Sequence, residues 1–419
     1  MCLAACACST HRYLSVPVHQ AEQDFKDHVG LVVFDPVTHK TIYEHQGDRY
    51  FTPGSNIKIL TFYTALRLLG DSIPALRYVQ KNDSLIVWGT GDPSFLYENT
   101  YLEAKTYTFL KDQPGKLCFS SSNFQTKVFG PGWAWDDYDE TYQVERTPFP
   151  IYGNWATVRK MNDRFLTAPQ VFNIATGDSA VNNKGRAVLS RGLDSNQLTY
   201  SPGKSGANEW KVPFHYSDEL LMKLLTDSLK REVMLVSMKL PPGAKTLYSV
   251  SADSLYRVMM QESDNFIAEQ LLMMCAVVVS DTLKPEIAIQ YMKKQWLADL
   301  PDNPVWMDGS GLSRYNLLTP RLIVALWDRI YDLVPRDRLF SLLAVGGERG
   351  TIKDYYKADR RFIIGKTGSL ANNHSLSGYL VTKRGRTLIF CWMNNNFTTP
   401  ARDVRLRMET VLKNVYENY

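Results

Sequence analysis

Several features by which common protein classes are recognised are missing from this sequence. No stretch of about 18 apolar residues occurs, so no transmembrane helix is expected. No run of Lys and Arg occurs, and a formal net charge of +5 is small for 419 residues, so no nucleic-acid partner is expected. The composition, with 44% hydrophobic and 22% charged residues, is that of a folded soluble protein, and the length predicts more than one domain.

Cysteine and histidine are scarce, and their spacing does not suit a metal site. The seven histidines form no His-Glu-x-x-His pair and the six cysteines form no Cys-x-x-Cys pair. We therefore expect no catalytic metal ion. Cys118, Cys275 and Cys391 stand singly in apolar surroundings, which predicts buried free thiols.

Hydrophobic patterning predicts the elements at the start of the chain. Residues 31–43 read as a β-hairpin that turns at Asp35 and Pro36. Phe51-Thr52-Pro53-Gly54 then breaks the chain, and Ser55 begins an apolar helix that ends at Gly70. From about Tyr78 to Gly243, short apolar runs alternate with Gly, Pro, Asn and Asp, which predicts a strand-rich module.

The later part of the chain returns to helical periodicity at residues 253–279. Strands are then predicted at 362–364, 378–382 and 387–393. A terminal helix is predicted to place one row of apolar residues on one side: Val404, Met408, Val411, Leu412 and Val415.

Three short motifs follow one another along the chain: Ser55-Asn56-Ile57-Lys58, Ser263-Asp264-Asn265 and Lys366-Thr367-Gly368. Together, S-x-x-K, S-D-N and K-T-G are the signature of penicillin-binding proteins and class A β-lactamases. Each motif alone is weak, because the chain repeats similar strings at Ser201-Pro202-Gly203-Lys204, Ser121-Ser122-Asn123 and Lys204-Ser205-Gly206.

Context separates the three motifs from these similar strings. Ser55 begins an apolar helix, so Lys58, one turn later, can face the same side, whereas Ser201 lies in a Pro/Gly/Asn segment. Lys366 follows three β-forming residues, which predicts a strand edge where a backbone can bind an extended peptide. Ser263 stands between two helical stretches, in a turn that can project its side chain.

The residue types suit acyl transfer. The Ser55 hydroxyl is a poor nucleophile until a base removes its proton, and Lys58 can act as that base only as a neutral amine. Burial and a second cation, Lys366, both favour the neutral form. Ser263 can relay a proton to the leaving amine, and Asn265 can hydrogen-bond the substrate amide.

The third motif and the nucleophile also supply groups that bind substrate. Thr367 can bind a terminal carboxylate beside Lys366, and Gly368 belongs to the same substrate-binding strand. The backbone N–H groups of Ser55 and Ser369 are predicted to form an oxyanion hole, where each donor contributes about 3 kcal/mol.

At these motifs the sequence resembles the class C low-molecular-mass penicillin-binding proteins, the D-Ala-D-Ala carboxypeptidase/endopeptidase family. Three further runs are typical of that family: Gly89-Thr90-Gly91-Asp92-Pro93, Gly130 to Tyr138, and Asp308-Gly309-Ser310-Gly311-Leu312-Ser313. The long gap between Ser55 and Ser263 also fits, because this class carries inserted domains there.

The resemblance implies an α+β multidomain fold. A transpeptidase domain like that of penicillin-binding proteins and β-lactamases, with an antiparallel sheet flanked by helices, is expected from residues 23–77 and 247–419. Residues 78–246 would form the β-rich insertion, which is somewhat shorter than in the family. The implied activity is D-Ala-D-Ala carboxypeptidase or endopeptidase action on peptidoglycan stem peptides, through an acyl-enzyme on Ser55. β-Lactam antibiotics would acylate the same serine, and no cofactor would be needed.

Asp137 is a candidate for substrate selection. The run Trp133-Ala134-Trp135-Asp136-Asp137-Tyr138 concentrates aromatic rings and carboxylates beside a Pro/Gly turn. One interpretation is a core Trp pair with solvated acids. The other, to which the resemblance points, is that Asp137 pairs with the free amino group on the diamino-acid side chain of the wall peptide.

Other functions remain open at this stage. A β-lactamase or esterase with the same chemistry would release penicillin quickly, whereas a peptidase would hold it. A peptidoglycan-binding homologue that has lost catalysis is a further alternative. A nucleotide-binding P-loop is excluded, because Leu198 and Arg360 stand where its first glycine is required.

The first residues bear on location. Leu3-Ala4-Ala5-Cys6 resembles the lipobox of bacterial lipoproteins, although the charged start and apolar core of a signal peptide do not precede it. Either the true start lies upstream or the match is accidental. We expect residues 1–22 to be an N-terminal tether or export remnant, Cys6 to be a candidate for lipidation and membrane attachment, and the protein to reside in the periplasm or cell envelope.

Overall fold

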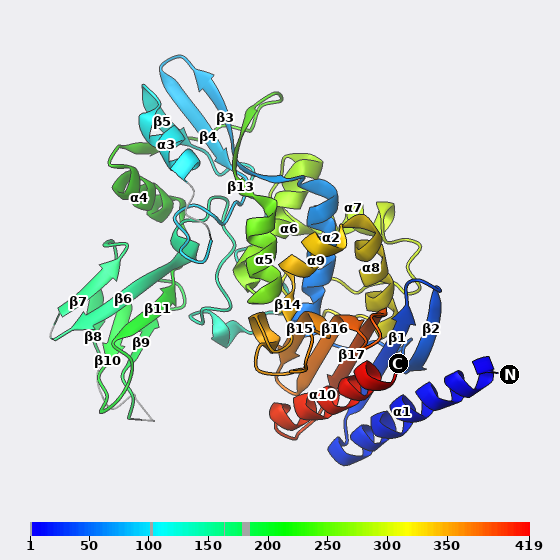
Figure 1. Ribbon diagram of the computed structural model, residues 1–419. Coiled ribbons are helices and arrows are strands. Elements are labelled where there is room, and N and C mark those ends of the chain that lie inside the picture. The colour runs from blue at the N-terminus through cyan, green and yellow to red at the C-terminus, as the bar shows by residue number, and fades with distance from the viewer. Residues whose placement is uncertain (1, 101–103, 163, 178–184) are drawn as a thin grey trace. The chain divides into compact units, whose positions relative to one another are not determined.

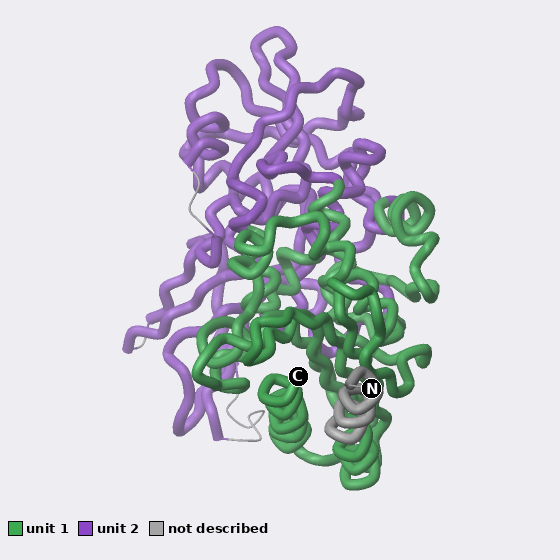
Figure 2. Tube along the Cα trace, turned by 45° about the vertical axis from the view of Figure 1, so that its right-hand side comes forward, with its two compact units in different colours: residues 1–67, 255–268, 288–419 green, residues 68–254, 269–287 purple. Residues whose placement is uncertain are grey.

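The computed structural model describes the backbone of residues 2–419 apart from 101–103, 163 and 178–184, and the side chains of that set from Leu14 onward. The chain forms two compact units, each made of separate segments (Figure 2). Unit 1 comprises Met1–Arg67, Leu255–Ala268 and Ala288–Tyr419, and unit 2 comprises Leu68–Ser254 and Glu269–Ile287. The predicted domains, a transpeptidase domain of residues 23–77 and 247–419 and an insertion of residues 78–246, remain predictions.

The main sheet of unit 1 is antiparallel and joins the two ends of the chain. Its strand order is β14 (Ala344–Val345), β15 (Ile363–Leu370), β16 (Asn373–Val381), β17 (Thr387–Asn395), β1 (His28–Asp35) and β2 (Lys40–His45). The predicted hairpin is therefore β1–β2, and the predicted late strands are β15, β16 and β17. Because β14 pairs only with Ile364 and Gly365, no described strand pairs with the outer side of residues 366–370.

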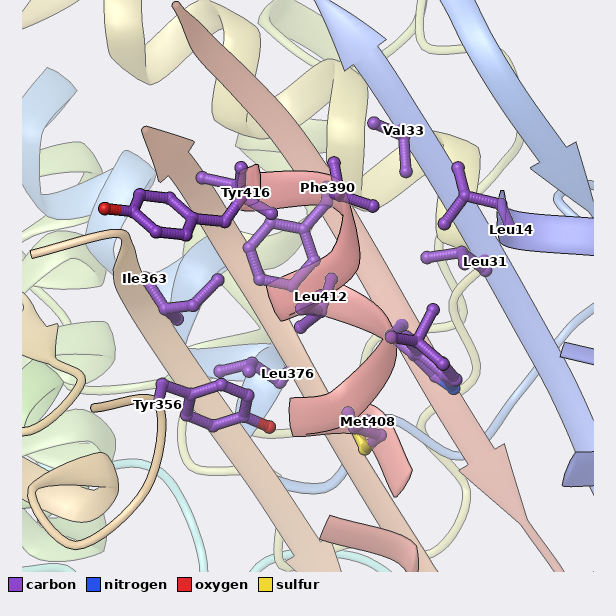
Figure 3. Packing of buried hydrophobic residues seen from close by; sticks show 14 of the residues in the cluster. Leu14, Leu31, Val33, Tyr356, Ile363, Leu376, Phe390, Met408, Leu412 and Tyr416 are labelled. Carbon is purple, nitrogen blue, oxygen red and sulfur yellow. The ribbon is translucent and has the colours of Figure 1, made fainter. Parts of the chain in front are cut away.

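Helices cover both faces of this sheet (Figure 1). On one face lie α1 (Cys2–Phe25) and α10 (Ala401–Asn418), which contact each other. The core beneath them is apolar, and Figure 3 shows Met408, Leu412 and Tyr416 of α10 over Ile363, Leu376 and Phe390 of the sheet. The apolar row predicted for the terminal helix is buried there.

The opposite face carries α8 (Pro320–Leu333), which contacts β1, β16 and β17, together with α2 (Lys58–Leu68). Pro320 at the first turn of α8 and Thr319, whose hydroxyl accepts from Leu322 N–H, begin this helix. The remaining helices of the second half are α5 (Ala252–Gln261), α6 (Asn265–Ser280), α7 (Pro285–Gln295) and α9 (Arg336–Leu342). The predicted helical stretch 253–279 is thus two helices, interrupted at Ser263.

Unit 2 contains the strand-rich module. Its larger sheet has the order β12 (Val233–Leu235), β5 (Lys116–Phe119), β4 (Ser84–Gly89), β3 (Ser72–Lys81) and β13 (Lys245–Ser251). Smaller sheets have the orders β8 (Ile174–Thr176), β10 (Leu198–Ser201), β9 (Val188–Arg191), and β11 (Glu209–Pro213), β6 (Trp155–Met161), β7 (Arg164–Ala168). The sequence pattern missed α3 (Ala104–Asp112) and α4 (Asp218–Leu229), which pack with these strands.

The fold class predicted from the motifs, an antiparallel sheet flanked by helices with a β-rich insertion, is confirmed. Cys118, Cys275 and Cys391 are buried free thiols, as the sequence predicts. No helix among the described residues is both long and apolar enough to cross a membrane. The segment predicted to be a tether forms most of α1, and Leu14 and Val18 of that helix are fully buried in the core of unit 1.

Candidate active site

Ser55 lies in a short 3-10 helix, η1 (Gly54–Ile57), which leads directly into α2. Gly54 begins this turn with φ +51°, a conformation that suits glycine. In a 3-10 turn, side chains three residues apart align, so Ser55 and Lys58 face the same side. Ser55 is half-buried, whereas Lys58 is fully buried. The helix predicted to begin at Ser55 therefore starts as a 3-10 turn.

The Lys58 amine lies within hydrogen-bond distance of Ser55, Asn265 and Ser310. Its Nζ lies 2.9 Å from Ser55 Oγ, 2.6 Å from Asn265 Oδ1 and 2.6 Å from the Ser310 carbonyl oxygen. The amide oxygen and the carbonyl can only accept, so they take two N–H donors of the amine. A neutral amine then has a lone pair left for the Ser55 hydroxyl proton. This arrangement suits a lysine that acts as a base.

Lys366 and Ser263 form the second part of the site. The fully buried Lys366 Nζ donates to Ser263 Oγ at 2.8 Å and to its neighbour's carbonyl, Thr367 O, at 2.6 Å. Burial, with the charge of Lys58 as a second cause, holds the pKa of Lys366 well below its usual range. Ser263 has φ +62°, an uncommon conformation for a residue other than glycine, which turns its side chain out between α5 and α6.

Glycines let the nucleophile turn approach strand β15 closely. A Cβ at Gly368 would lie 2.2 Å from Pro53 O, and a Cβ at Gly54 would lie 2.9 Å from the Ser369 backbone nitrogen. Side chains at these two positions would force the segments apart. The absence of a Cβ at both positions therefore keeps the backbone of η1 beside Ser369.

Asn56 fixes the position of η1, a role that no sequence motif indicates. Its side chain is fully buried, accepts from Ser377 Oγ at 2.7 Å and donates to Ser375 Oγ. Both serines belong to β16, where they pair with Lys366 and Gly368 of β15. Asn56 occupies a variable position of S-x-x-K, so only the three-dimensional register identifies it.

Asp308 organises the loop that offers the Ser310 carbonyl to Lys58. Its buried carboxylate accepts from the backbone N–H of Gly311 at 2.9 Å, from that of Ser313 at 2.7 Å, and from Asn316 Nδ2 at 2.7 Å. Thr61 of α2 donates to the Gly309 carbonyl at 2.7 Å. The Asp-Gly-Ser-Gly composition signalled this turn, but not its contact with the lysine.

The outer part of β15 carries the predicted substrate-binding residues. The hydroxyls of Thr367 and Thr351 lie 2.7 Å apart, and the exposed Ser369 hydroxyl lies 2.8 Å from His374 Nδ1. Burial, aided by the charges of Arg405 and Lys366, lowers the pKa of His374 to about 3. His374 is therefore neutral at physiological pH. The outer side of Thr367, Gly368 and Ser369 has no described partner strand.

The structure places the similar strings elsewhere. Ser201 ends β10 in unit 2, and Ser121 donates to Asp218 at 2.6 Å. The Asn123 amide donates to the Gly89 carbonyl at 2.8 Å. By contrast, Ser55, Lys58, Ser263, Asn265 and Lys366 are brought together within unit 1. Their catalytic roles remain predictions.

The last two candidates belong to other segments of the chain. Asp137 belongs to η2 (Trp135–Asp137) of unit 2, where it is half-buried. The pKa of the Tyr142 phenol is raised, first by burial and next by a hydrogen bond to Asp137. The Cys6 side chain lies outside the described residues.

Comparison with known proteins agrees with this geometry. The family model of the D-Ala-D-Ala carboxypeptidase 3 (S13) family matches residues 14–415. The chain is 24% identical to the D-alanyl-D-alanine carboxypeptidase DacB of Haemophilus influenzae, over 88% of this chain and 86% of that protein. It is also 23% identical to penicillin-sensitive carboxypeptidase A of Dictyostelium discoideum, over 84% and 80% of the two chains.

Solved structures show the same fold. Penicillin binding protein 4 from H. influenzae superimposes with a TM-score of 0.75 at 20% identity, covering 98% of each chain. A predatory peptidoglycan endopeptidase from Bdellovibrio bacteriovorus superimposes with a TM-score of 0.51 at 15% identity, covering 93% of this chain and 92% of that one. With the family model matching nearly the whole sequence, the chain belongs to the D-Ala-D-Ala carboxypeptidase 3 (S13) family, as its three motifs predict.

Proposed function

We propose that this chain is a serine-type D-Ala-D-Ala carboxypeptidase, with or without endopeptidase activity, that acts on peptidoglycan stem peptides through an acyl-enzyme on Ser55. The observation that carries the proposal is the placement of the buried Lys58 amine, 2.9 Å from Ser55 Oγ and bound to two groups that only accept. Family membership supplies the substrate class.

In the first step, Ser55 Oγ attacks the carbonyl of the penultimate D-Ala and forms an ester. The hydroxyl proton passes to neutral Lys58, which is poised for it by its two other hydrogen bonds. Ser263, bound to Lys366, delivers its proton to the amine of the terminal D-Ala as the C–N bond breaks, and it regains a proton from Lys58, which returns to the neutral form. Water then hydrolyses the ester, with Lys58 again as base.

Substrate would bind as an extended chain along the free edge of β15. Thr367 and Lys366 would hold the terminal carboxylate, and Asn265 would hydrogen-bond the peptide amide. The backbone N–H groups of Ser55 and Ser369 would form the oxyanion hole, which the close approach at Gly54 and Gly368 supports. β-Lactams would acylate Ser55 in the same place.

Asp137 is proposed to select the peptide. Its carboxylate would pair with the free amino group on the side chain of the diamino acid. The acids around it support this role: Asp136 and Asp139 are close neighbours, and Glu140 has a pKa raised by burial and by the charges of Asp139 and Asp137. Such a negative region favours a cationic group.

The location follows from the substrate. Peptidoglycan lies outside the cytoplasmic membrane, so we propose that the protein works in the cell envelope or periplasm. Lipid attachment at Cys6 is proposed from the Leu3-Ala4-Ala5-Cys6 match, and intact-mass measurement of the native protein tests it. An unmodified Cys6 in that protein would contradict the attachment and leave the activity unaffected.

Labelling with a fluorescent penicillin, followed by peptide mapping, tests the main proposal. The label is expected on Ser55, and Ser55→Ala is expected to fold without being labelled. Ser201→Ala is the matched control, because it removes the serine of the other S-x-x-K string and should leave labelling intact. Label on Ser201, or persistent labelling of Ser55→Ala, would contradict the assignment. Release of penicillin within seconds would instead favour a β-lactamase.

A further inference from the structure

The loop formed by residues 128–146, which carries Asp137, is closed at its base. The Arg146 N–H donates to the Val128 carbonyl at 2.9 Å, so the two ends of the loop meet. Within it, Gln143 Nε2 donates to the Ala134 carbonyl at 2.7 Å. The tip is open to solvent, and Trp135 is 76% exposed there. Loops whose ends meet and whose tips are exposed are frequently functional.

A buried ion pair anchors one side of this base. Arg146 donates from Nε and Nη2 to Glu269 Oε2, at 2.9 and 2.5 Å, and each side chain is only 1% exposed. The guanidinium also lies over the Trp133 ring, 5.0 Å from its centroid. The Phe129 ring packs against the same indole in an edge-to-face arrangement. The first turn of the loop is thereby held by Arg146.

A second buried arginine holds the middle of the loop. Glu145, fully buried, lies 3.7 Å from the Arg191 guanidinium and 2.9 Å from His215 Nδ1. Arg191 donates to the Tyr138 carbonyl at 3.0 Å and lies 5.2 Å from the centroid of its ring. The neighbouring residues Glu145 and Arg146 thus form ion pairs with two different buried partners, Arg191 and Glu269.

Buried ion pairs are a poor means of raising stability, since apolar residues of similar volume often do as well or better. They do define geometry, because a buried charge tolerates few alternative positions. Glu269 lies in the part of α6 that belongs to unit 2, so this part of the helix supplies the anchor of the loop. The ion pair therefore fixes the base of the loop on this part of α6.

We propose that the Arg146–Glu269 pair is a positioning device that holds loop 128–146 so that Asp137 can select peptides with a free side-chain amine. The inference rests on the proposed function and on the proposed role of Asp137. Glu269 and Arg146 are positioning residues: neither needs to touch the substrate. Their loss should therefore affect recognition of the amine and not the acylation chemistry.

Cleavage kinetics on two peptides test the proposal. One stem peptide ends in D-Ala-D-Ala and carries a free side-chain amine, and the other is its N-acetylated form. For Glu269→Gln and Arg146→Lys, kcat/KM on the free-amine peptide is expected to fall about tenfold, mainly through KM, because a displaced loop weakens the pairing of Asp137 with the amine. Cleavage of the acetylated peptide and acylation by fluorescent penicillin should stay within about twofold, a change too small to report a lost contact.

Three controls make the result decisive. Asp281→Asn breaks a different carboxylate–arginine pair of unit 2, with Arg77 outside the loop, and should leave the selectivity for the amine unchanged. In an Asp137→Asn background, Glu269→Gln should add little, because both act on one interaction. The double variant Arg146→Met with Glu269→Leu removes both charges, so it should recover the thermal stability lost in Glu269→Gln without recovering selectivity.

Equal losses on both peptides, fully additive losses with Asp137→Asn, or unchanged selectivity in Arg146→Lys would each overturn the positioning role. These results differ from failure of the proposed function itself, in which the wild-type protein would cleave neither peptide. A wild-type protein that cleaves both peptides equally well would remove the role of Asp137 and this inference with it.

Discussion

Replacing Lys58 with arginine separates the charge of this residue from its ability to accept a proton. The side chain is fully buried, and its amine contacts Ser55, Asn265 and the Ser310 carbonyl at 2.6–2.9 Å. A guanidinium keeps the charge and can donate to the same acceptors, but it does not lose its proton in this pH range. The Ser55 hydroxyl then has no base beside it.

The size of the loss follows from the chemistry of the pair. A positioned general base contributes about 10²–10⁴-fold, and a nucleophile and base that act as a unit lose more than either contribution suggests. We expect Lys58→Arg to acylate about 10³–10⁴-fold more slowly, which corresponds to roughly 4–5.5 kcal/mol. The larger side chain also overpacks the site and costs about 1–3 kcal/mol of stability, which thermal unfolding reports separately.

The assay is the second-order rate of acylation by fluorescent penicillin, measured for wild type, Lys58→Arg and Lys58→Met. If the lysine acts as a base, both variants are slow. If only its positive charge matters, Lys58→Arg stays active while Lys58→Met does not. Acylation of Lys58→Arg at close to the wild-type rate would refute the reasoning.

Three further predictions concern other groups. Asp137→Asn should lower kcat/KM on free-amine peptides about ten- to a hundredfold, the value of a partly desolvated charge-assisted pair, while acetylated peptides are spared; equal losses would make Asp137 structural. The pKa of Lys366 is lowered in the folded protein, so between that pKa and 10.5 the amine is protonated in the unfolded state and neutral in the folded state. The free energy of unfolding of the wild-type protein should therefore rise with pH in this range. Lys366→Met should lack this rise in chemical denaturation, and a parallel pH dependence would contradict the burial of the amine. His374, with a pKa of about 3 against 6.5 when unfolded, is neutral in the folded protein, so stability is lost as pH falls below about 6.5, by up to about 1.4 kcal/mol per pH unit. His374→Asn should flatten denaturation midpoints measured from pH 7 to pH 4, and an unchanged slope would count against this origin.

The motif residues could be found from the sequence because they are short local strings. Ser55 and Lys58 are aligned by one turn of backbone, and Lys366 stands on a strand that its β-forming neighbours predict. The hydrogen bonds that hold these residues in place could not be predicted from the sequence. The partners of Asn56 depend on the pairing of Lys366 with Ser377 across two strands, and no periodicity encodes that register.

The helix α1 at the start of the chain was not predicted from the sequence. Leu14 and Val18 are spaced as on a helix face, yet Pro17 stands between them, and proline inside a helix removes a hydrogen bond and clashes with the preceding turn. Pro17 therefore weakens the sequence signal for a helix in this segment. Burial of both apolar side chains under the main sheet is the tertiary gain that offsets this cost.

The pairing of β1 with β17 has a consequence for how the chain is made. Val32 of β1 pairs with Cys391 of β17. During synthesis, β1 can therefore form this pairing only after β17 has been made. Contacts between such distant residues are slow to form, and until then β1 and β2 remain a hairpin with an open edge. Unit 2 has no such delay, because its residues precede the closing strands and can fold as they emerge. A chain that stops before β17 would carry a folded insertion and an incomplete sheet, and such a product is a ready substrate for proteases and aggregation.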